Sequence, residues 1–147
     1  MKRSMIDKEA IVLNVSLKDW EEAVRACGNV LVETGNVERT YVEAMVKNIR
    51  DLGPYIIIAP GIALPHARPE DGVHKTGICV VVLREEVSFG PGKEVKVLIG
   101  LAAKDNNSHL DLLKIVAEVI SSEKSLGQLK NAQSQDEVMG LFNGKEE

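Results

Sequence analysis

The sequence predicts an α/β protein in which helices cover both faces of a mixed β-sheet. Two observations lead to this prediction. Residues 76–83 and 95–103 are continuous apolar runs without polar alternation, as in strands that are buried on both faces. Segments with apolar residues at helical spacing lie before and after these runs. Strands covered on both sides need a helical layer on each face, so we expect a three-layer α/β/α arrangement.

The first part of the chain is predicted to contain one strand and two helices. Residues 10–15 form an apolar run that predicts the strand. Ser16 and Asp19 resemble a capping box, with Asp in place of the usual Glu, and predict the start of a helix. That helix is expected to end at residues 34–35, where a glycine can close it. A second helix is expected to end near residues 53–54.

The middle of the chain contains the remaining predicted strands. Residues 55–58 are a short β-branched run that predicts a buried strand. Residues 59–72 are rich in proline and glycine and are predicted to be a loop or an edge segment. The apolar runs at 76–83 and 95–103 predict two longer strands, and the turn residues at 89–92 separate them.

The last third of the chain is predicted to be helical. Ser108 and Asp111 resemble a second capping box, and Ser108 is expected to cap a helix over residues 109–121. This helix is apolar over much of its circumference, so we expect it to be largely buried. The remaining expected elements are short helices near 123–131 and 134–143 and a frayed tail at 144–147.

Length and composition limit the function classes. A chain of 147 residues is most simply a single domain over residues 1–147 with a sizeable core. The net charge of −4 and the lack of a basic stripe argue against nucleic-acid binding. Cys27 and Cys79 are far apart, which predicts buried free thiols in a reducing compartment. No signal peptide is visible and no apolar run approaches the ~20 residues of a membrane span, so we expect a soluble, cytoplasmic protein.

The first candidate site residue is His66, at the end of an apolar segment. Pro65 fixes its own φ and favours an extended Leu64, and Gly61 permits close backbone approach. A histidine presented in this way at a strand end can accept a phosphoryl group, because its neutral ring nitrogen is a nucleophile near neutral pH. A loop histidine with a structural hydrogen bond is the alternative that the sequence leaves open.

The second candidate is His109, near the predicted start of a helix. Free N–H groups and the helix dipole favour an anion there, and a protonated His109 could balance phosphate charge. The alternative is a surface histidine near the cap. For His66 and His109 to meet, the strands at 55–58 and 95–103 must end on the same side of the sheet.

Other polar residues support less specific predictions. Arg68 could form a bidentate pair with a phosphate or an ion pair with Glu70 or Asp71. His74 is expected in a solvated turn. Three histidines and two cysteines without short metal-ligand spacing make a zinc site unexpected. No cofactor is expected either, because the chain has no glycine-rich phosphate loop and no nucleophile elbow.

Two motifs together resemble a known family. The run Pro60-Gly-Ile-Ala-Leu-Pro-His66 and the downstream run Ser108-His-Leu-Asp-Leu-Leu113 are similar to those of the enzyme IIA domains of the bacterial sugar phosphotransferase system, of the fructose/mannitol type. The resemblance covers essentially the whole chain. Residues 53–77 resemble more particularly the ascorbate-type enzyme IIA. The family fold is a mixed five-stranded sheet between helices.

The resemblance implies a phosphotransferase that works through a phosphohistidine. His66 would accept a phosphoryl group on Nε2 from the histidine phosphocarrier protein, with Nδ1 hydrogen-bonded to the backbone. It would pass the group to a cysteine of a cognate enzyme IIB, and a membrane enzyme IIC would move the sugar, with ascorbate as the expected sugar. His109 matches the family's second histidine.

The resemblance also implies supporting groups and contacts. Arg68 and the helix start at Ser108 would stabilise the phosphoryl charge. An arginine on the helix before the histidine is frequent in this branch, and Arg50, Asn48 or Arg68 could fill that position. Partner docking is expected to be transient, with a buried area of roughly 1,200 Å² or less. The expected contacts are Ile62, Ala63 and Leu64.

Two other functions remain open at this point. The same type of domain occurs as a regulatory phosphorylation sensor without a transport role, and its chemistry at His66 would be identical. A non-catalytic ligand-binding domain that kept only the fold is the other alternative, and the presence of both histidines argues against it.

Overall fold

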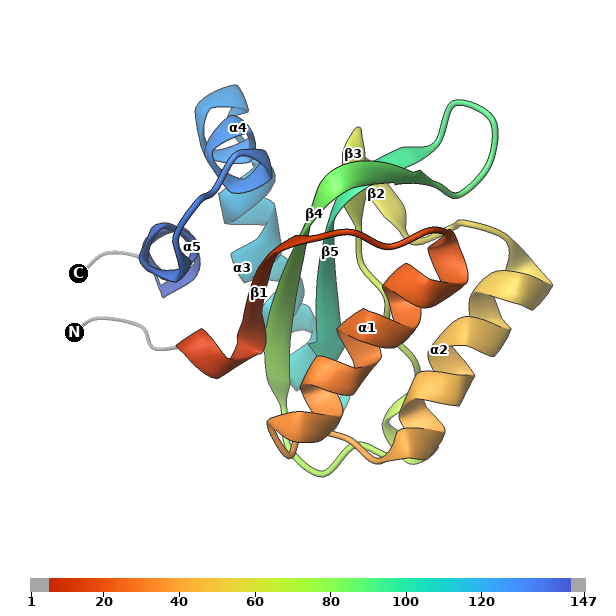
Figure 1. The fold of residues 1–147 in the computed structure, drawn as a ribbon. Helices are drawn as coiled ribbons and strands as arrows, with labels where there is room; N and C mark the ends of the chain where they lie inside the picture. The colour runs from red at the N-terminus through yellow and green to blue at the C-terminus, as the bar shows by residue number, and fades with distance from the viewer. Residues whose placement is uncertain (1–5, 144–147) are drawn as a thin grey trace.

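A computed structural model describes residues 6–143 and contains a mixed five-stranded sheet (Figure 1). The strand order is β1-β4-β5-β3-β2, with β1–β4 and β3–β5 parallel and β4–β5 and β2–β3 antiparallel. The predicted fold class is therefore confirmed. The strands are β1 (Ile11–Val15), β2 (Ile57–Ala59), β3 (Gly61–Ala63), β4 (Gly77–Ser88) and β5 (Glu94–Ala102).

Helices cover the sheet on both faces, as Figure 1 shows. The pair α1 (Trp20–Glu33) and α2 (Arg39–Leu52) packs on one face, and α3 (Asn106–Ile120), α4 (Glu123–Lys130) and α5 (Gln135–Asn143) lie on the other. Each of the predicted helices is present. Within residues 6–143, no helix is long and apolar enough to cross a membrane. The predicted tail at 144–147 lies outside the described residues.

Two helices begin at residues other than those predicted. Asp19, not Ser16, caps α1, and its side chain accepts a hydrogen bond from the Glu22 N–H. Asp105, not Ser108, caps α3, which begins three residues earlier than predicted. In both cases the capping residue is an aspartate with an extended backbone, followed directly by residues that are already helical. Aspartate and serine are equally good caps, so residue type alone did not distinguish them.

The largest difference from prediction lies in residues 55–72. The strand β2 is last in the strand order and is therefore an edge strand. It is not buried as predicted, because Ile58 is 44% exposed. The predicted loop contains β3, which lies inside the sheet between β5 and β2. Gly61 has a φ of 82°, and this left-handed conformation reverses the chain directly after Pro60. The density of proline and glycine thus indicated a turn and concealed the short strand that follows it.

Close packing of α1 on the sheet depends on a glycine in β5. Cys27 on α1 and Cys79 on β4 are buried free thiols, as predicted, with their sulfur atoms 3.5 Å apart. A Cβ on Gly100 would lie 2.6 Å from the Cys27 sulfur and 2.7 Å from the Cys79 sulfur. Any larger residue at position 100 would therefore push α1 away from β5.

Candidate active site

The site lies where β3 and β5 end. These strands are parallel neighbours, so their carboxyl ends lie at the same edge of the sheet. The Leu101 N–H donates to the Pro65 carbonyl at 3.1 Å, which extends the contact between the two segments to the residue before His66. The predicted condition, that the strand at 55–58 and β5 end on the same side of the sheet, is wrong, because β2 is antiparallel to β3 and therefore runs opposite to β5. The strand that leads to His66 is β3, which does end on the same side as β5.

The structure brings His66 and His109 together. His66 follows β3, and His109 lies in the first turn of α3, after β5. Their ring centroids are 5.5 Å apart, with an angle of 48° between the ring planes. Both side chains are half-buried, so the pair is accessible from one side.

A backbone carbonyl fixes the His66 ring. Nδ1 lies 2.6 Å from the Leu64 carbonyl oxygen. A carbonyl oxygen can only accept a hydrogen bond, so Nδ1 carries the proton of the neutral ring. Nε2 is then unprotonated, and no hydrogen bond from another residue of the 6–143 segment occupies it. The ring is therefore held as the tautomer with a nucleophilic Nε2.

Tyr41 holds the backbone on both sides of the site. It projects from α2, is completely buried, and its hydroxyl donates to the Leu101 carbonyl at 2.6 Å. The same oxygen accepts from the Ala67 N–H at 2.9 Å. Burial raises the pKa of Tyr41, so the hydroxyl stays a donor. The sequence predicted no role for Tyr41, although a buried tyrosine hydroxyl normally needs a partner.

Tyr55 packs against the His66 ring. Its ring lies edge-on to the imidazole, with centroids 6.1 Å apart. The Asn48 amide, on α2, lies beside the Tyr55 hydroxyl and offsets part of the rise in Tyr55 pKa that burial causes. The sequence assigned Tyr55 to a strand, so its contact with His66 was missed. This contact depends on the β2–β3 hairpin, and no sequence pattern indicates it.

His109 is neutral near pH 7. Burial lowers its pKa below the ordinary value of 6.5, and the neighbouring His66 lowers it further. The helix start beside it is already occupied by the Asp105 carboxylate, which accepts from the Ser108 N–H at 2.8 Å. This hydrogen bond lowers the pKa of Asp105 and keeps it ionised. Ser108 is therefore not the cap, and its N–H is already engaged. Its predicted role toward a phosphoryl group stays a prediction.

Arg68 forms ion pairs within its own turn. Its side chain is 75% exposed, and Nε lies 3.8 Å from Asp71 and 3.9 Å from Glu70. Its backbone N–H also donates to Asp71 at 2.9 Å. Of the two predictions for Arg68, the structure shows the ion pair with Glu70 and Asp71. A role of Arg68 in phosphate binding stays a prediction.

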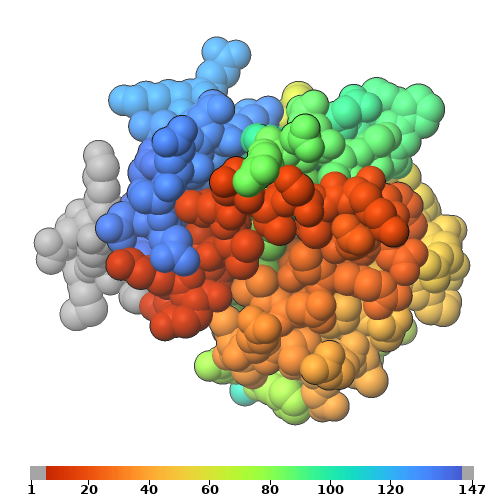
Figure 2. All heavy atoms as spheres, viewed as in Figure 1, coloured from red at the N-terminus to blue at the C-terminus, as the bar shows by residue number. Residues whose placement is uncertain are grey.

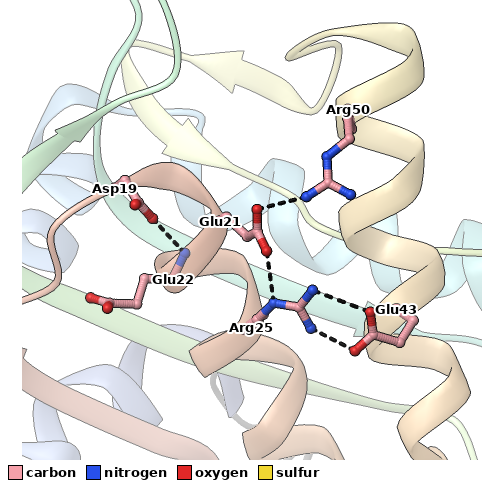
Figure 3. A network of polar contacts seen from close by, with 6 residues as sticks. All are labelled: Asp19, Glu21, Glu22, Arg25, Glu43 and Arg50. Carbon is pink, nitrogen blue, oxygen red and sulfur yellow. Dashed lines mark hydrogen bonds and ion pairs between the residues drawn. The ribbon is translucent and has the colours of Figure 1, made fainter.

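Arg50 belongs to a network between α1 and α2 (Figure 3). Its Nη2 lies 2.6 Å from Glu21, which also binds Arg25, and Arg25 pairs with Glu43. Of the three residues considered for the supporting position, Asn48 is the one that joins the cluster around the histidines, through Tyr55.

The exposed apolar surface differs from the one predicted. Ile62, Ala63 and Leu64 are at most 4% exposed, so their prediction as surface contacts is wrong. They fill the interior because β3 lies inside the sheet. The large exposed apolar side chains of residues 6–143 are instead Leu52, Tyr55, Ile58 and Leu110.

Fold and site together define an α/β protein with two neighbouring imidazoles where β3 and β5 end. The solved complex of enzyme IIA(Mtl) and phosphorylated enzyme IIB(Mtl) from Escherichia coli contains a similar chain. The TM-score is 0.84 at 32% identity, and the match covers 95% of this chain and 98% of that one.

Two relatives from Escherichia coli (strain K12) are similar in sequence. The mannitol-specific cryptic phosphotransferase enzyme IIA component is 37% identical over 128 residues, which are 86% of this chain and 87% of the relative. The ascorbate-specific EIIA component is 32% identical over 145 residues, or 97% and 94% of the two chains. Residues 4–145 match the model of the family "Phosphoenolpyruvate-dependent sugar phosphotransferase system, EIIA 2". The chain belongs to this family, and it is a phosphocarrier component of that system.

Proposed function

We propose that His66 accepts a phosphoryl group on Nε2 from the histidine phosphocarrier protein and passes it to a cysteine of an enzyme IIB. The observation that carries this proposal is the hydrogen bond between Nδ1 and the Leu64 carbonyl, which leaves Nε2 with a free lone pair. Membership of the enzyme IIA family supports the class of reaction. The phosphorylated enzyme IIB in the solved mannitol complex supports the choice of acceptor.

The transfer consists of two substitutions at phosphorus. The lone pair on Nε2 attacks the phosphorus of the carrier's phosphohistidine, so a new N–P bond forms while the carrier's N–P bond breaks. A thiolate of enzyme IIB then attacks the same phosphorus, an S–P bond forms, and His66 regains its lone pair. Nδ1 keeps its proton and donates it to the Leu64 carbonyl throughout, and this carbonyl oxygen stabilises the positive charge of the phosphorylated ring. Catalysis then consists mainly of positioning and charge stabilisation.

His109 supports the phosphoryl group beside it. Its ring lies 5.5 Å from that of His66, centroid to centroid, so a ring N–H can reach a phosphoryl oxygen. Burial keeps the pKa of His109 low and the ring neutral between transfers. An arriving phosphoryl dianion favours protonation, so the ring can gain positive charge when the phosphoryl group is present.

The partners dock on the exposed apolar residues around the histidines. Tyr55 contacts the His66 ring and Leu110 directly follows His109. Exposed tyrosine and leucine side chains at such a site lose their water when a partner covers them, and this stabilises a transient complex. Donor and acceptor must both reach Nε2, so the two proteins use this surface in turn.

For the sugar, we propose ascorbate. The support is the run 53–77 and the match to the ascorbate-specific component, which covers 97% of this chain. The test is growth on ascorbate or mannitol of a host in which the gene is deleted. Loss of growth on ascorbate alone is expected, whereas loss on mannitol alone would contradict the choice.

The relay itself is tested with purified proteins. The protein is incubated with labelled phosphoenolpyruvate, enzyme I and the histidine phosphocarrier protein, and the product is tested for acid lability and base stability. We expect one labelled histidine, no label in His66→Ala, and full label in the matched control His74→Ala, since His74 is exposed beside Glu38. Label that persists in His66→Ala would show that another residue is the acceptor.

A further inference from the structure

A cavity of about 440 Å³ lies at the edge of the sheet opposite the histidines. The end of β1, the middle of β4, the start of β5 and the segment between α4 and α5 surround it. In Figure 2 the red surface of β1, the green surface of β4 and the blue surface of the α4–α5 segment meet on this face of the molecule. From Lys96 to the end of β5 the strand runs about 20 Å, so the cavity is well separated from His66.

Three permanent cations line this cavity. They are Arg84 on β4, Lys96 on β5 and Lys130 at the end of α4, and no carboxylate is among the described residues that line the cavity. Within residues 6–143, none of the three forms an ion pair with an aspartate or glutamate. The chain as a whole is acidic, with a net charge of −4. A cluster of cations without counter-charges in an acidic protein calls for an anion from outside.

An asparagine side chain and a backbone carbonyl hold two of these cations in place. Asn14 has a φ of 59°, and among the described residues it is the single non-glycine residue with a positive φ. It lies where the pairing of β1 with β4 shifts register, and its Oδ1 accepts from Arg84 Nε at 3.1 Å. Lys96 Nζ in turn donates to the Arg84 carbonyl at 2.7 Å. A left-handed asparagine at a β-bulge costs free energy and is typical of functional sites.

The third cation is held over a glycine. A Cβ on Gly61 would lie 3.1 Å from Lys130 Nζ and 3.0 Å from Cε, so the lysine side chain packs directly on the backbone of β3. Gly61 thus permits two features at once, the chain reversal before β3 and the position of Lys130. The three cations consequently come from three different elements and converge on one cavity.

We propose that this cavity binds a small phosphate monoester, a phosphorylated metabolite about the size of a sugar phosphate. A guanidinium matches two phosphate oxygens, and lysine ammonium groups add point charges to the same dianion. The volume lies within the range of small-molecule sites. Asn131 and Gln133 also line the cavity and offer amides to the hydroxyl groups of such a molecule. The binding is reversible, involves no covalent step and is independent of His66.

The test is a titration of the full-length ¹⁵N-labelled protein with glucose 6-phosphate, followed by NMR. We expect saturable shifts of backbone amides in residues 13–14, 83–84 and 130–133. Lys96→Gln and Arg84→Gln should each weaken binding about tenfold, as for the loss of one charge-assisted hydrogen bond. The matched control Lys124→Gln, exposed on α4 and outside the cavity, should bind within about twofold of the original protein.

Three results would overturn the proposal. Shifts confined to the residues around His66 and His109 would place the phosphate at the histidine site. An equal loss of affinity in Lys124→Gln and Lys96→Gln would show attraction by general charge rather than by this cavity. Inorganic phosphate that binds as tightly as glucose 6-phosphate would show a simple anion site, and glucose as a neutral control should produce no shifts. Since Lys96→Gln removes only one side-chain contact, it keeps the test valid even if Arg84→Gln does not fold.

Discussion

The two ends of β5 differ in the groups that surround them. At its carboxyl end, the groups in contact with His66 are a carbonyl, a tyrosine ring and a second imidazole. At its amino end, Arg84, Lys96 and Lys130 surround a cavity with permanent positive charge. A covalent acceptor must be neutral to attack phosphorus and must release the group again. The difference indicates that titratable rings suit transfer, whereas fixed cations suit reversible binding.

Among the substitutions that test this difference, removing the second imidazole should have the largest effect, and the quantity affected is the rate of phosphoryl transfer. We expect His109→Ala to slow phosphoryl transfer to His66 about a hundredfold, in the range for one general acid–base group or charge-stabilising donor. Stability should hardly change, because His109 is half-buried and lies in the first turn of α3. Rapid-quench measurement of labelled protein gives the rate, and circular dichroism verifies the fold. An unchanged rate would leave His66 acting without a second ring.

Removing the Tyr41 hydroxyl tests how much the uncharged hydrogen bonds at the histidine end of β5 contribute to stability. In Tyr41→Phe the Ala67 N–H and the Leu101 carbonyl lose a partner. Unsatisfied buried groups of this kind cost about 1–3 kcal/mol, so the free energy of unfolding in urea should fall by that amount. The matched control is Tyr55→Phe, because Tyr55 is 48% exposed and the phenylalanine ring can still pack on His66. Equal losses in the two variants would show that the Tyr41 contacts contribute little.

The pH dependence of stability should reveal the neutral state of His109. Its pKa is lower in the folded protein than the ordinary 6.5, so near that pH the unfolded chain binds more protons. The contribution is therefore fully present above pH 6.5 and is lost as the pH falls through this value toward the folded pKa. Between pH 7.5 and 5.5, the urea midpoint should fall more in the original protein than in His109→Asn. Parallel pH profiles would contradict the lowered pKa.

The smallest effect is expected from an exposed cation on α2 that belongs to the α1–α2 network and not to the cluster around the histidines. Arg50→Gln removes the exposed ion pair with Glu21, and such pairs contribute about 0–1 kcal/mol. The rate of transfer to His66 should stay within about twofold of the original. A loss as large as that in His109→Ala would mean that a fixed cation does serve the transfer site, and the contrast between the two ends of β5 would fail.

The sequence predicted the helical layers and the long central strands better than the short strand β3. Continuous apolar runs locate β4 and β5 because burial on both faces leaves no polar alternation. The strand β3 was missed because it is three residues long and begins at Gly61, directly after Pro60, where local composition indicates only a turn. What makes it a strand is the pairing with β5, which is far away in the sequence.

The two histidines were predicted, but most of their surroundings were not. A histidine after Pro65 and another near a helix start are visible as patterns along the chain. The contacts made by Tyr41 and Tyr55 depend on how α2 and the β2–β3 hairpin approach the sheet, and no local pattern contains that information. The cavity at the other end of β5 was missed for the same reason, since Arg84, Lys96 and Lys130 converge only in three dimensions.

Hydrogen exchange at one amide reports whether the backbone before His66 stays paired with β5. The Leu101 N–H donates a hydrogen bond to the Pro65 carbonyl, and the Leu101 carbonyl accepts one from the Tyr41 hydroxyl. This proton can exchange with solvent only when the peptide before His66 leaves the sheet, which also exposes the buried residues of β3. Its exchange should therefore be as slow as that of the core amides of β5. The backbone at His66 would then open only together with the core, so the imidazole would hold one fixed position as long as the protein stays folded.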